Sequence, residues 1–339
     1  MQSFHLVNKI GKKMIEFLQG RKIAILGYGS QGKAQALNLR DSGIEPLIGL
    51  PAKSRSAKEA KKNGFHVTTA RKAVFLSDVI AVLIPDHKHR ELFNSIPASG
   101  LSGKTLIFAH GLSVAFGLVR PPVDCDVIMV APHGPGVRLR ERYMTGEFFT
   151  AFAGVKQDYS GKAWPIARSY AAAIGCPPAN LFESTLEDEA IGDIFGEQAV
   201  LCGGLVGLLE TGFSTLVKKG HSPESAYLEC VYQLDLIIDL IKRYGTAGMF
   251  ERISKTAAFG SLSVKDKLFD SAFSGKMERL YNEIKSGKFA QKLARENENS
   301  LANLKSMLSA VKGSPLQKTQ AAVFRRLNAR THRPKAAGR

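Results

Sequence analysis

Short apolar runs alternate with helix-like segments through the first half of the chain. We expect strands at residues 22–26, 46–50, 79–84, 105–109, 126–130 and 149–154. Helical patterning follows several of these runs, at residues 34–41, 58–63, 88–94 and 164–174. Strands that alternate with helices at this spacing predict a parallel sheet covered by helices on both faces.

The pattern changes at about residue 183, where strand-like runs stop and long helical periodicities begin. These helical segments cover residues 189–218, 222–244 and 276–286. Pro177 and Pro178 stand just before the change and are typical of a junction. We therefore expect an α/β domain at residues 1–184 and an all-helical domain at 185–324. Residues 325–339 hold six basic residues and no acid, which predicts a basic, disordered tail.

Composition excludes several classes of protein. The chain has 339 residues, of which 44% are apolar, so it can build sizeable cores and is not collagen-like or wholly disordered. Its four cysteines form no CxxC pair, which indicates neither a disulfide scaffold nor a zinc module. The first twenty residues lack the apolar core of a signal peptide. We expect a cytoplasmic protein.

The longest apolar stretch and the net charge permit more than one interpretation. Residues 199–209 are fewer than the ~20 residues that a membrane helix needs, and their glycines favour a closely packed core helix. The 47 basic and 30 acidic residues give a net charge of +17. This charge suits an anionic partner such as a phosphorylated cofactor or a metabolite, but a solvated basic surface would also account for it. We expect neither a membrane nor a nucleic acid as partner.

A glycine-rich loop follows the first predicted strand. Gly-Tyr-Gly-Ser-Gln-Gly at residues 27–32 leads directly into a helix-forming segment. Gly27 permits the tight turn, Gly29 lets the backbone approach a pyrophosphate, and Gly32 lets the helix pack closely on the strand. The helix N-terminus then offers N–H groups to phosphate. This order of strand, loop and helix predicts a dinucleotide site.

The end of the second strand bears on the choice between NAD and NADP. An acid there would bind the ribose hydroxyls and repel a 2′-phosphate, but no acid occurs before Glu59. Ser54, Arg55 and Ser56 offer hydroxyls and a cation to a phosphate instead, so we expect NADP(H). An ordinary basic loop is the alternative interpretation. Asp86 ends the third run, at the edge where such a sheet binds its ligand.

Paired carboxylates stand in the helical half. Asp193 and Glu197 are four residues apart and share a helix face, where two like charges repel unless a cation such as Mg²⁺ neutralises them. Glu229 stands in a second apolar helical stretch. A solvated helix face is the commoner reason for such spacing, but the apolar run after Glu197 indicates that this turn packs against something.

Five sequence blocks together resemble the ketol-acid reductoisomerase family in its short, class I form. They are Gly-Tyr-Gly-Ser-Gln-Gly at 27–32, Phe-Ala-His-Gly at 108–111, Ala-Pro-His-Gly-Pro-Gly at 131–136, Phe-Gly-Glu-Gln-Ala-Val-Leu-Cys-Gly-Gly at 195–204 and Ala-Tyr-Leu-Glu-Cys at 226–230. The resemblance implies a Rossmann-type NADP domain, a knotted helical domain, and a homodimer or higher homo-oligomer with shared active sites. It also implies a two-step reaction of valine and isoleucine biosynthesis. With two Mg²⁺ ions, an alkyl group of a 2-aceto-2-hydroxy acid migrates, and NADPH then reduces the product to a 2,3-dihydroxy acid.

The resemblance also assigns roles to individual residues. Those of the cofactor site are Tyr28, Gly29, Ser30 and Gln31 at the pyrophosphate, Ser54 and Ser56 at the 2′-phosphate, and Asp86 and Gly136 as further contacts. His110 corresponds to the family's active-site histidine, and Ser254 to a serine that contacts substrate. Asp193 would bridge both metals, Glu197 would bind the first, and Glu229 of the partner subunit the second.

This sequence departs from the family pattern beside these residues. Gln233 replaces a second glutamate four residues after Glu229. Its carbonyl oxygen can still bind Mg²⁺ as a fourth metal ligand, but one negative charge is lost, which predicts weaker binding of the second Mg²⁺. His133 replaces a lysine, so a permanent cation is lost. Smaller departures are Pro51, His87, Lys255, Ala258 and Phe259, with Lys53 and Arg55 left to replace the basic residue missing at position 51.

Three functions are compatible with this sequence. The first is a working ketol-acid reductoisomerase. The second is a diverged paralogue that reduces 2-keto acids with NADPH and has weak or no isomerase activity, which the changes at 133 and 233 favour. The third is a non-catalytic binding protein with a vestigial site.

Overall fold

A computed structural model describes residues 11–331 of the chain. The chain divides into two compact units, and the division falls between Gly192 and Asp193. We call them the sheet unit and the helical unit. The division lies inside helix α9 (Leu186–Gly196), beyond the junction expected at residue 184. Helix α9 continues across this division, so the helical pattern of the sequence does not change between Gly192 and Asp193.

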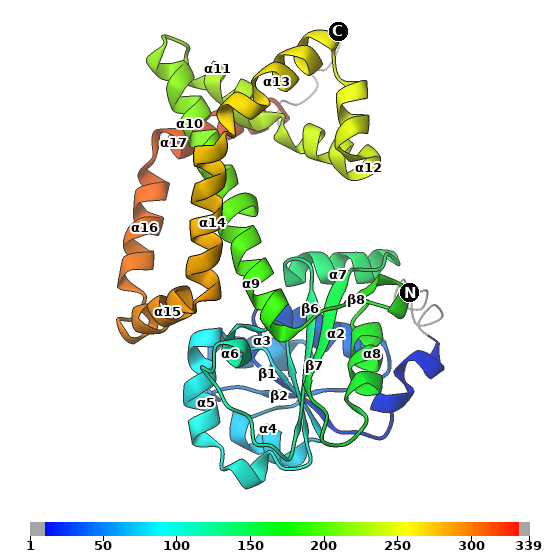
Figure 1. The fold of residues 1–339 in the computed structure, drawn as a ribbon. Helices are drawn as coiled ribbons and strands as arrows, with labels where there is room; N and C mark the ends of the chain where they lie inside the picture. The colour runs from blue at the N-terminus through cyan, green and yellow to red at the C-terminus, as the bar shows by residue number, and fades with distance from the viewer. Residues whose placement is uncertain (1–10, 332–339) are drawn as a thin grey trace. The chain divides into compact units, whose positions relative to one another are not determined.

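Within residues 11–331, the sheet unit contains one eight-stranded sheet (Figure 1). Its strand order is β3-β2-β1-β4-β5-β6-β7-β8. The strands are β1 (Ile23–Leu26), β2 (Leu47–Gly49), β3 (Val67–Thr68), β4 (Val79–Val82), β5 (Thr105–Phe108), β6 (Asp126–Pro132), β7 (Ala151–Gln157) and β8 (Leu181–Glu183). The six runs expected from the sequence all form strands, whereas the short strands β3 and β8 were not expected.

Strand direction differs from the parallel sheet expected. Strands β1 to β6 pair in parallel, but β7 is antiparallel to β6, and β8 is parallel to β7. The sheet is therefore mixed. The helix between β6 and β7, α7 (Gly136–Thr145), packs on α2 (Ser30–Asp41). Strand β7 consequently begins where β6 ends, with Pro132 opposite Ala151.

Helices cover both faces of the sheet, as expected. The remaining helices of this unit are η1 (Lys12–Leu18), α3 (Arg55–Lys62), α4 (Ala70–Leu76), η2 (Asp86–Lys88), α5 (His89–Ser95), η3 (Ala98–Gly100), α6 (Leu112–Ala115), α8 (Ala163–Ala173) and η4 (Pro178–Asn180). Successive strand residues enter different cores, since Ile25 packs in one buried cluster and Leu26 in the other. Buried apolar side chains on both faces thus fix the position of each strand end.

The helical unit contains only helices within the described residues. They are the π-helical turns η5 (Glu197–Leu201) and η6 (Leu228–Tyr232), with α10 (Gly203–Lys218), α11 (Pro223–Tyr227), α12 (Leu234–Arg252), α13 (Lys255–Leu268), α14 (Ser271–Lys285), α15 (Lys288–Glu298), α16 (Ala302–Gly313) and α17 (Pro315–Thr331). Helix α12 bends at Gly245, whose φ is 73°. The all-helical prediction is confirmed, and the knot stays a prediction.

Helix α17 corrects part of the expected tail. It continues through residues 325–331, which the sequence indicated as disordered, while residues 332–339 lie outside the described residues. The helix is anchored before its basic end, because Val323 is buried in a cluster with Phe213, Ala226 and Tyr227. Alanine, arginine and leucine at the basic end favour continuation of a helix that has already formed.

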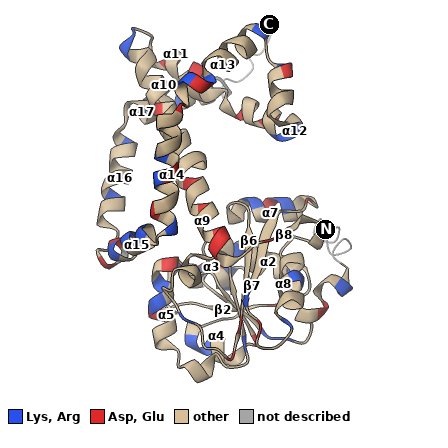
Figure 2. Cartoon of the chain, viewed as in Figure 1, with Lys and Arg blue, Asp and Glu red and all other residues tan. Residues whose placement is uncertain are grey.

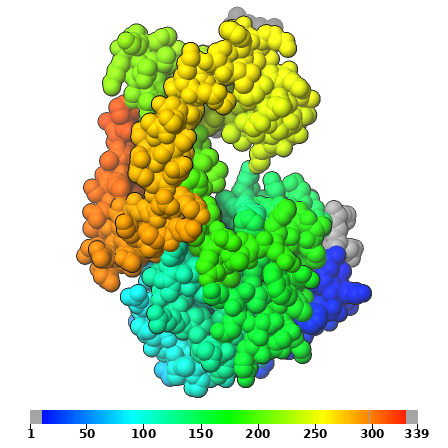
Figure 3. Space-filling model, in the orientation of Figure 1, coloured from blue at the N-terminus to red at the C-terminus, as the bar shows by residue number. Residues whose placement is uncertain are grey.

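The helical unit exposes many large apolar side chains. Leu201 is 67% exposed, Leu236 62% and Phe259 77%. Residues 203–209 of α10 carry no charge (Figure 2), and side chains of α14 are seen at the surface in the space-filling view (Figure 3). The expectation that residues 199–209 form a packed core helix is therefore wrong for the single chain.

One described helical stretch is long and apolar enough to cross a membrane. It runs over Leu186–Lys218, has a mean hydropathy of 1.6 in its most apolar window, and has only 6% of that window buried. Length and composition alone are weak evidence for a membrane span.

Candidate functional site

Five loops of the sheet unit meet at one edge of the sheet. They follow β1, β2, β4, β5 and β6, which run in parallel, so their carboxyl ends share that edge. The loops contain residues 27–32, 50–56, 83–86, 109–111 and 133–136. All the site residues expected in the first domain therefore lie on this edge, where open α/β sheets bind their ligands.

The glycine-rich loop has the geometry that its sequence predicts. Gly27 has a φ of 104°, and a Cβ atom on it would lie 2.5 Å from the carbonyl oxygen of Leu83. A Cβ on Gly32 would lie 2.5 Å from the carbonyl oxygen of Gly27. Helix α2 begins at Ser30 with no side-chain cap, so N–H groups of its first turn remain available to a phosphate.

Two side chains of this loop form hydrogen bonds within the protein and are therefore not positioned to bind a pyrophosphate. Tyr28 is 3% exposed, its hydroxyl accepts a hydrogen bond from Asn63 at 2.9 Å, and burial raises its pKa. The Gln31 side chain donates to the carbonyl oxygen of Gly134 at 2.8 Å. Contacts from Tyr28 to a cofactor would therefore use its backbone, while Ser30 and Gly29 are exposed.

The loop after β2 forms the start of a helix. Ser54 caps α3, and its hydroxyl oxygen accepts from the amide of Ala57 at 3.1 Å, so its hydrogen can still be donated. Glu59, the first acid after the strand, forms an ion pair with Lys33 at 2.5 Å. The hydrogen bond from Lys33 holds the pKa of Glu59 below its usual value. The carboxylate of Glu59 is thus already paired with the Lys33 ammonium group.

A buried histidine that we did not expect connects two loops at the edge. His89 is 3% exposed; its Nε2 lies 3.0 Å from the carbonyl oxygen of Ile84, and its Nδ1 lies 2.8 Å from the Ser113 hydroxyl. A carbonyl only accepts, so Nε2 carries the hydrogen and Nδ1 accepts from Ser113. Burial lowers the pKa of His89 and favours this neutral form. Asp86 lies beside this pair, 3.4 Å from the Ser113 hydroxyl.

His110 lies at the end of β5 and is held by a buried carboxylate. Both carboxylate oxygens of Glu189 lie 3.0 Å from Nδ1 of His110, and the amide of Gly111 donates to one of them at 2.7 Å. Glu189 is only 5% exposed. Because a carboxylate accepts, a neutral imidazole here carries its hydrogen on Nδ1, and Nε2 holds the lone pair. Sequence reasoning missed Glu189, although its spacing of four residues before Asp193 was a signal.

Helix α9 brings Glu189 to this position. Thr185 caps the helix by accepting from the amide of Asp188 at 2.9 Å. A Cβ on Gly111 would lie 2.0 Å from the carbonyl oxygen of Leu186, so only glycine allows the loop after β5 to approach the first turn of α9 so closely. This close approach places the carboxylate of Glu189 against the backbone of the His110 loop.

The carboxylates of α9 form the first candidate metal site. Ligand oxygens of Glu189 and Asp193, one helical turn apart, lie within 4.8 Å of each other. Carboxylate oxygens are the ligands that Mg²⁺ prefers, so the donor set fits this ion. Asp193 and Glu197 are exposed, and Glu197 begins the π-helical turn η5. Such turns occur frequently at functional sites.

The second candidate metal position also lies on a π-helical turn. Glu229 stands within η6, and Gln233 follows it. The Gln233 side-chain nitrogen donates to Glu229 at 3.3 Å, and both side chains are exposed. Among residues 11–331, no cluster of potential metal ligands contains Glu197, Glu229 or both. One chain by itself does not gather the four metal ligands that the sequence predicts.

The remaining predicted residues have structural contacts of their own. The amide of His133 donates to Thr150 at 2.9 Å, and its ring meets the Phe152 ring edge-on, with 4.4 Å between centroids. A Cβ on Gly136 would lie 2.1 Å from the carbonyl oxygen of Ser30, so this glycine lets α7 approach the dinucleotide loop. Ser254 caps α13 and accepts from Ala257 at 3.1 Å.

Together, the loop, the sheet edge and the histidine held by an acid define a nucleotide-dependent oxidoreductase. Residues 17–180 match the model of the acetohydroxy acid isomeroreductase NADPH-binding domain, and residues 186–328 match that of the ketol-acid reductoisomerase C-terminal domain. The chain belongs to the ketol-acid reductoisomerase family, as the sequence resemblance indicated.

Solved structures agree with this assignment. An NADH-preferring ketol-acid reductoisomerase from an uncultured archaean is 36% identical; the match covers 91% of this chain and 95% of that one, with a TM-score of 0.88. A semialdehyde dehydrogenase NAD-binding protein from Cupriavidus necator is 18% identical over 77% of this chain and 100% of its own, with a TM-score of 0.56. A 1-pyrroline-5-carboxylate reductase from Streptococcus pyogenes is 15% identical over 78% of this chain and 98% of its own, with a TM-score of 0.51. These last two show the fold alone.

Proposed function

We propose that this chain converts 2-aceto-2-hydroxy acids into 2,3-dihydroxy acids, with NADPH and Mg²⁺, in branched-chain amino acid biosynthesis. The observation that supports this proposal best is the contact of His110 with buried Glu189, one helical turn before Asp193. It holds a proton-transfer group at the edge of the sheet that carries the dinucleotide loop, and the helix that supplies Glu189 continues to Asp193. When bound, NADPH supplies a hydride and Mg²⁺ stabilises developing negative charge on oxygen.

The chain's own residues support NADPH over NADH. The hydroxyls of Ser54 and Ser56, with the Arg55 guanidinium, would hold the 2′-phosphate at the start of α3. Glu59 would not repel that phosphate strongly, because its charge is paired with Lys33. The archaean relative is named as NADH-preferring, so titration of this chain with NADPH and with NADH tests the preference directly.

His110 and Glu189 would handle the proton. Nε2 of His110 can accept a proton from a substrate hydroxyl, and the resulting imidazolium would be stabilised by the adjacent Glu189 carboxylate. The amide of Gly111 fixes that carboxylate, so the ring keeps one orientation. The low exposure of Glu189 strengthens the interaction, since water screens it little.

A second copy of the chain would complete the site. The exposed apolar side chains of the helical unit support an oligomer, because large exposed apolar areas on a protein mark interaction sites. Glu229 of the partner subunit would then supply the ligand that one chain does not bring to Asp193. With Gln233 in place of an acid, the second Mg²⁺ would bind more weakly than the first.

The second candidate function is reduction without efficient isomerisation. Gln233 favours it, since a neutral amide that donates to Glu229 contributes no charge to a metal site. His133 favours it as well, because a histidine in place of a lysine removes a permanent cation from this position.

Two parallel assays separate these functions. Purified protein with NADPH and Mg²⁺ receives 2-acetolactate in one assay and 3-hydroxy-3-methyl-2-oxobutanoate, the isomerised keto acid, in the other. Oxidation of NADPH with both substrates supports the reductoisomerase, and oxidation with the second alone supports the reductase. No turnover of either would contradict both and leave a binding protein.

A further inference from the structure

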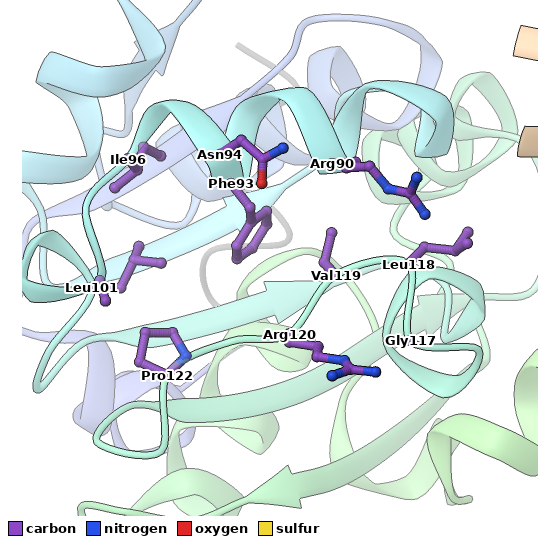
Figure 4. Close-up of a pocket in the computed structure, with 11 residues that line it drawn as sticks. Arg90, Phe93, Asn94, Ile96, Leu101, Gly117, Leu118, Val119, Arg120 and Pro122 are labelled. Carbon is purple, nitrogen blue, oxygen red and sulfur yellow. The ribbon is translucent and has the colours of Figure 1, made fainter. Parts of the chain in front are cut away.

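The sheet unit contains a cavity separate from the site described above. It has a volume of about 380 Å³ and lies between α5 and the loop of residues 117–122 (Figure 4). Phe93 and Val119 point toward each other across it, and Ile96 and Leu101 extend its apolar floor. This volume is near the lower end of the range for small-molecule pockets, which run from about 300 to 1,000 Å³.

Two arginines stand at one end of this cavity. Arg90 comes from α5 and Arg120 from the facing loop, both on the side of Gly117 and Leu118 (Figure 4). Both side chains are exposed, and neither forms an ion pair or side-chain hydrogen bond with another residue among positions 11–331. Two guanidinium groups without an acidic partner suit an anion, and their planar donors match a carboxylate bidentately.

The apolar floor and the two arginines together restrict the class of ligand that fits this cavity. An inorganic anion would leave the floor formed by Phe93, Ile96, Leu101 and Val119 without contact, and a dinucleotide is too large for this volume. A small carboxylate with an aliphatic group satisfies both parts, since its chain covers the floor while its charge meets the arginines.

Both walls of the cavity connect to the predicted active-site loops. Helix α5 begins at His89, which contacts the Ser113 hydroxyl at 2.8 Å. On the other wall, the amide of Val119 donates to the carbonyl oxygen of Ser113 at 3.0 Å. Ser113 follows His110 by three residues and lies beside Asp86. A ligand that shifts α5 or the 117–122 loop would therefore act on both the cofactor loop and the histidine loop.

We propose that this cavity is an effector site that binds a small aliphatic carboxylate and changes cofactor affinity through Ser113. The binding step does not depend on the proposed reaction. Because coupling between two ligands is reciprocal, NADPH also changes the affinity for the carboxylate.

Calorimetry of the full-length protein with 3-methylbutanoate tests binding. Two further compounds separate the contributions of charge and apolar group to binding. 3-Methylbutanamide keeps the shape without the charge, and acetate keeps the charge without most of the apolar group. We expect saturable binding of 3-methylbutanoate only, weakened about tenfold or more in Arg90→Gln/Arg120→Gln. The matched control Lys72→Gln/Lys162→Gln also removes two exposed charges from the sheet unit and should bind as the unchanged protein does.

Further titrations test the coupling. NADPH affinity should change when 3-methylbutanoate is saturating, and Ser113→Ala should reduce that change while 3-methylbutanoate still binds. Absence of saturable binding, or equal binding by the double arginine variant, overturns the proposed site. Direct competition between 3-methylbutanoate and NADPH overturns it as well, since the two would then share one site. Binding with no change in NADPH affinity overturns the effector role.

Discussion

The two units of this chain bury their apolar side chains to very different extents. The sheet unit packs one cluster on each face of its sheet, with residues such as Ile25 and Phe108 fully buried. The helical unit has a buried cluster of four residues and leaves Leu201 and Phe259 more than half exposed. The sheet unit can therefore form its core within one chain, whereas the helical unit leaves large apolar side chains exposed, as the proposed oligomer requires.

This difference predicts where substitutions act. Changes in the helical unit should alter assembly and metal dependence, and changes in the sheet unit should alter cofactor binding and proton transfer. Burying one large apolar side chain contributes about 1.5–3 kcal/mol, so a few contacts across an interface would stabilise an oligomer strongly.

The largest effect is expected when charge is placed on the exposed apolar surface of the helical unit. Leu208 and Leu236 are 55% and 62% exposed. Leu208→Glu/Leu236→Glu should weaken the oligomer by about 10³-fold or more, because two charges per chain lose water on association. Analytical ultracentrifugation measures this change. The matched control is Val123→Glu, since Val123 is 86% exposed on the sheet unit; dissociation by that variant too would contradict the comparison.

Next in size is the loss of the buried acid beside His110. Glu189→Gln should lower kcat about 10²-fold, because a neutral amide cannot stabilise a charged imidazolium, while NADPH affinity should change little. Steady-state kinetics and NADPH titration separate these effects. The control Glu187→Gln changes a half-buried acid of the same helix, which pairs with Lys156. Equal activity of the two variants would remove Glu189 from the proposed mechanism.

A smaller gain is expected where the chain departs from its family. Gln233→Glu with His133→Lys should raise 2-acetolactate turnover about tenfold and lower the Mg²⁺ concentration needed, because negative charge returns to the second metal position. Turnover of the already isomerised keto acid should change much less. If both substrates respond equally, isomerisation is not the step that these positions affect.

Cofactor preference should shift more modestly. Ser54→Ala/Ser56→Ala should weaken NADPH binding about fivefold and leave NADH binding unchanged, since only NADPH carries the 2′-phosphate. Fluorescence titration at low and high salt measures both affinities, and NADPH binding should also weaken as salt screens Arg55. An equal loss of NADH affinity would show that the variant disturbs the loop in general.

The smallest expected effect is a change in the pH dependence of stability. The pKa of His89 lies below its ordinary value of 6.5, so between these two pKa values the unfolded chain binds a proton that the folded chain does not. The free energy of unfolding should fall as pH falls through this window. His89→Gln should remove that slope and lower stability by about 1 kcal/mol at neutral pH. Urea unfolding at several pH values checks this, with exposed His66→Gln as the control that keeps the slope.

Local sequence patterns predicted much of the fold but not contacts between distant segments. The runs that became β1, β2, β4, β5, β6 and β7 were visible because each is apolar and ends at a turn. The reversed direction of β7 was not visible, because an apolar run has the same pattern in either direction. The Glu189 contact joins residues 79 positions apart, so no local spacing around His110 could show it.

The π-helical turns have a consequence for how this sequence can vary. A turn with i to i+5 hydrogen bonds contains one residue more than an α-helical turn of the same rise. Loss of a single codon within residues 197–201 would let the helix continue as regular α-helix, so its hydrogen bonding would survive. It would nevertheless rotate Asp193 by about 100° about the helix axis relative to α10. Active relatives of this protein should therefore have no insertion or deletion at residues 197–201, even though most of this segment is exposed.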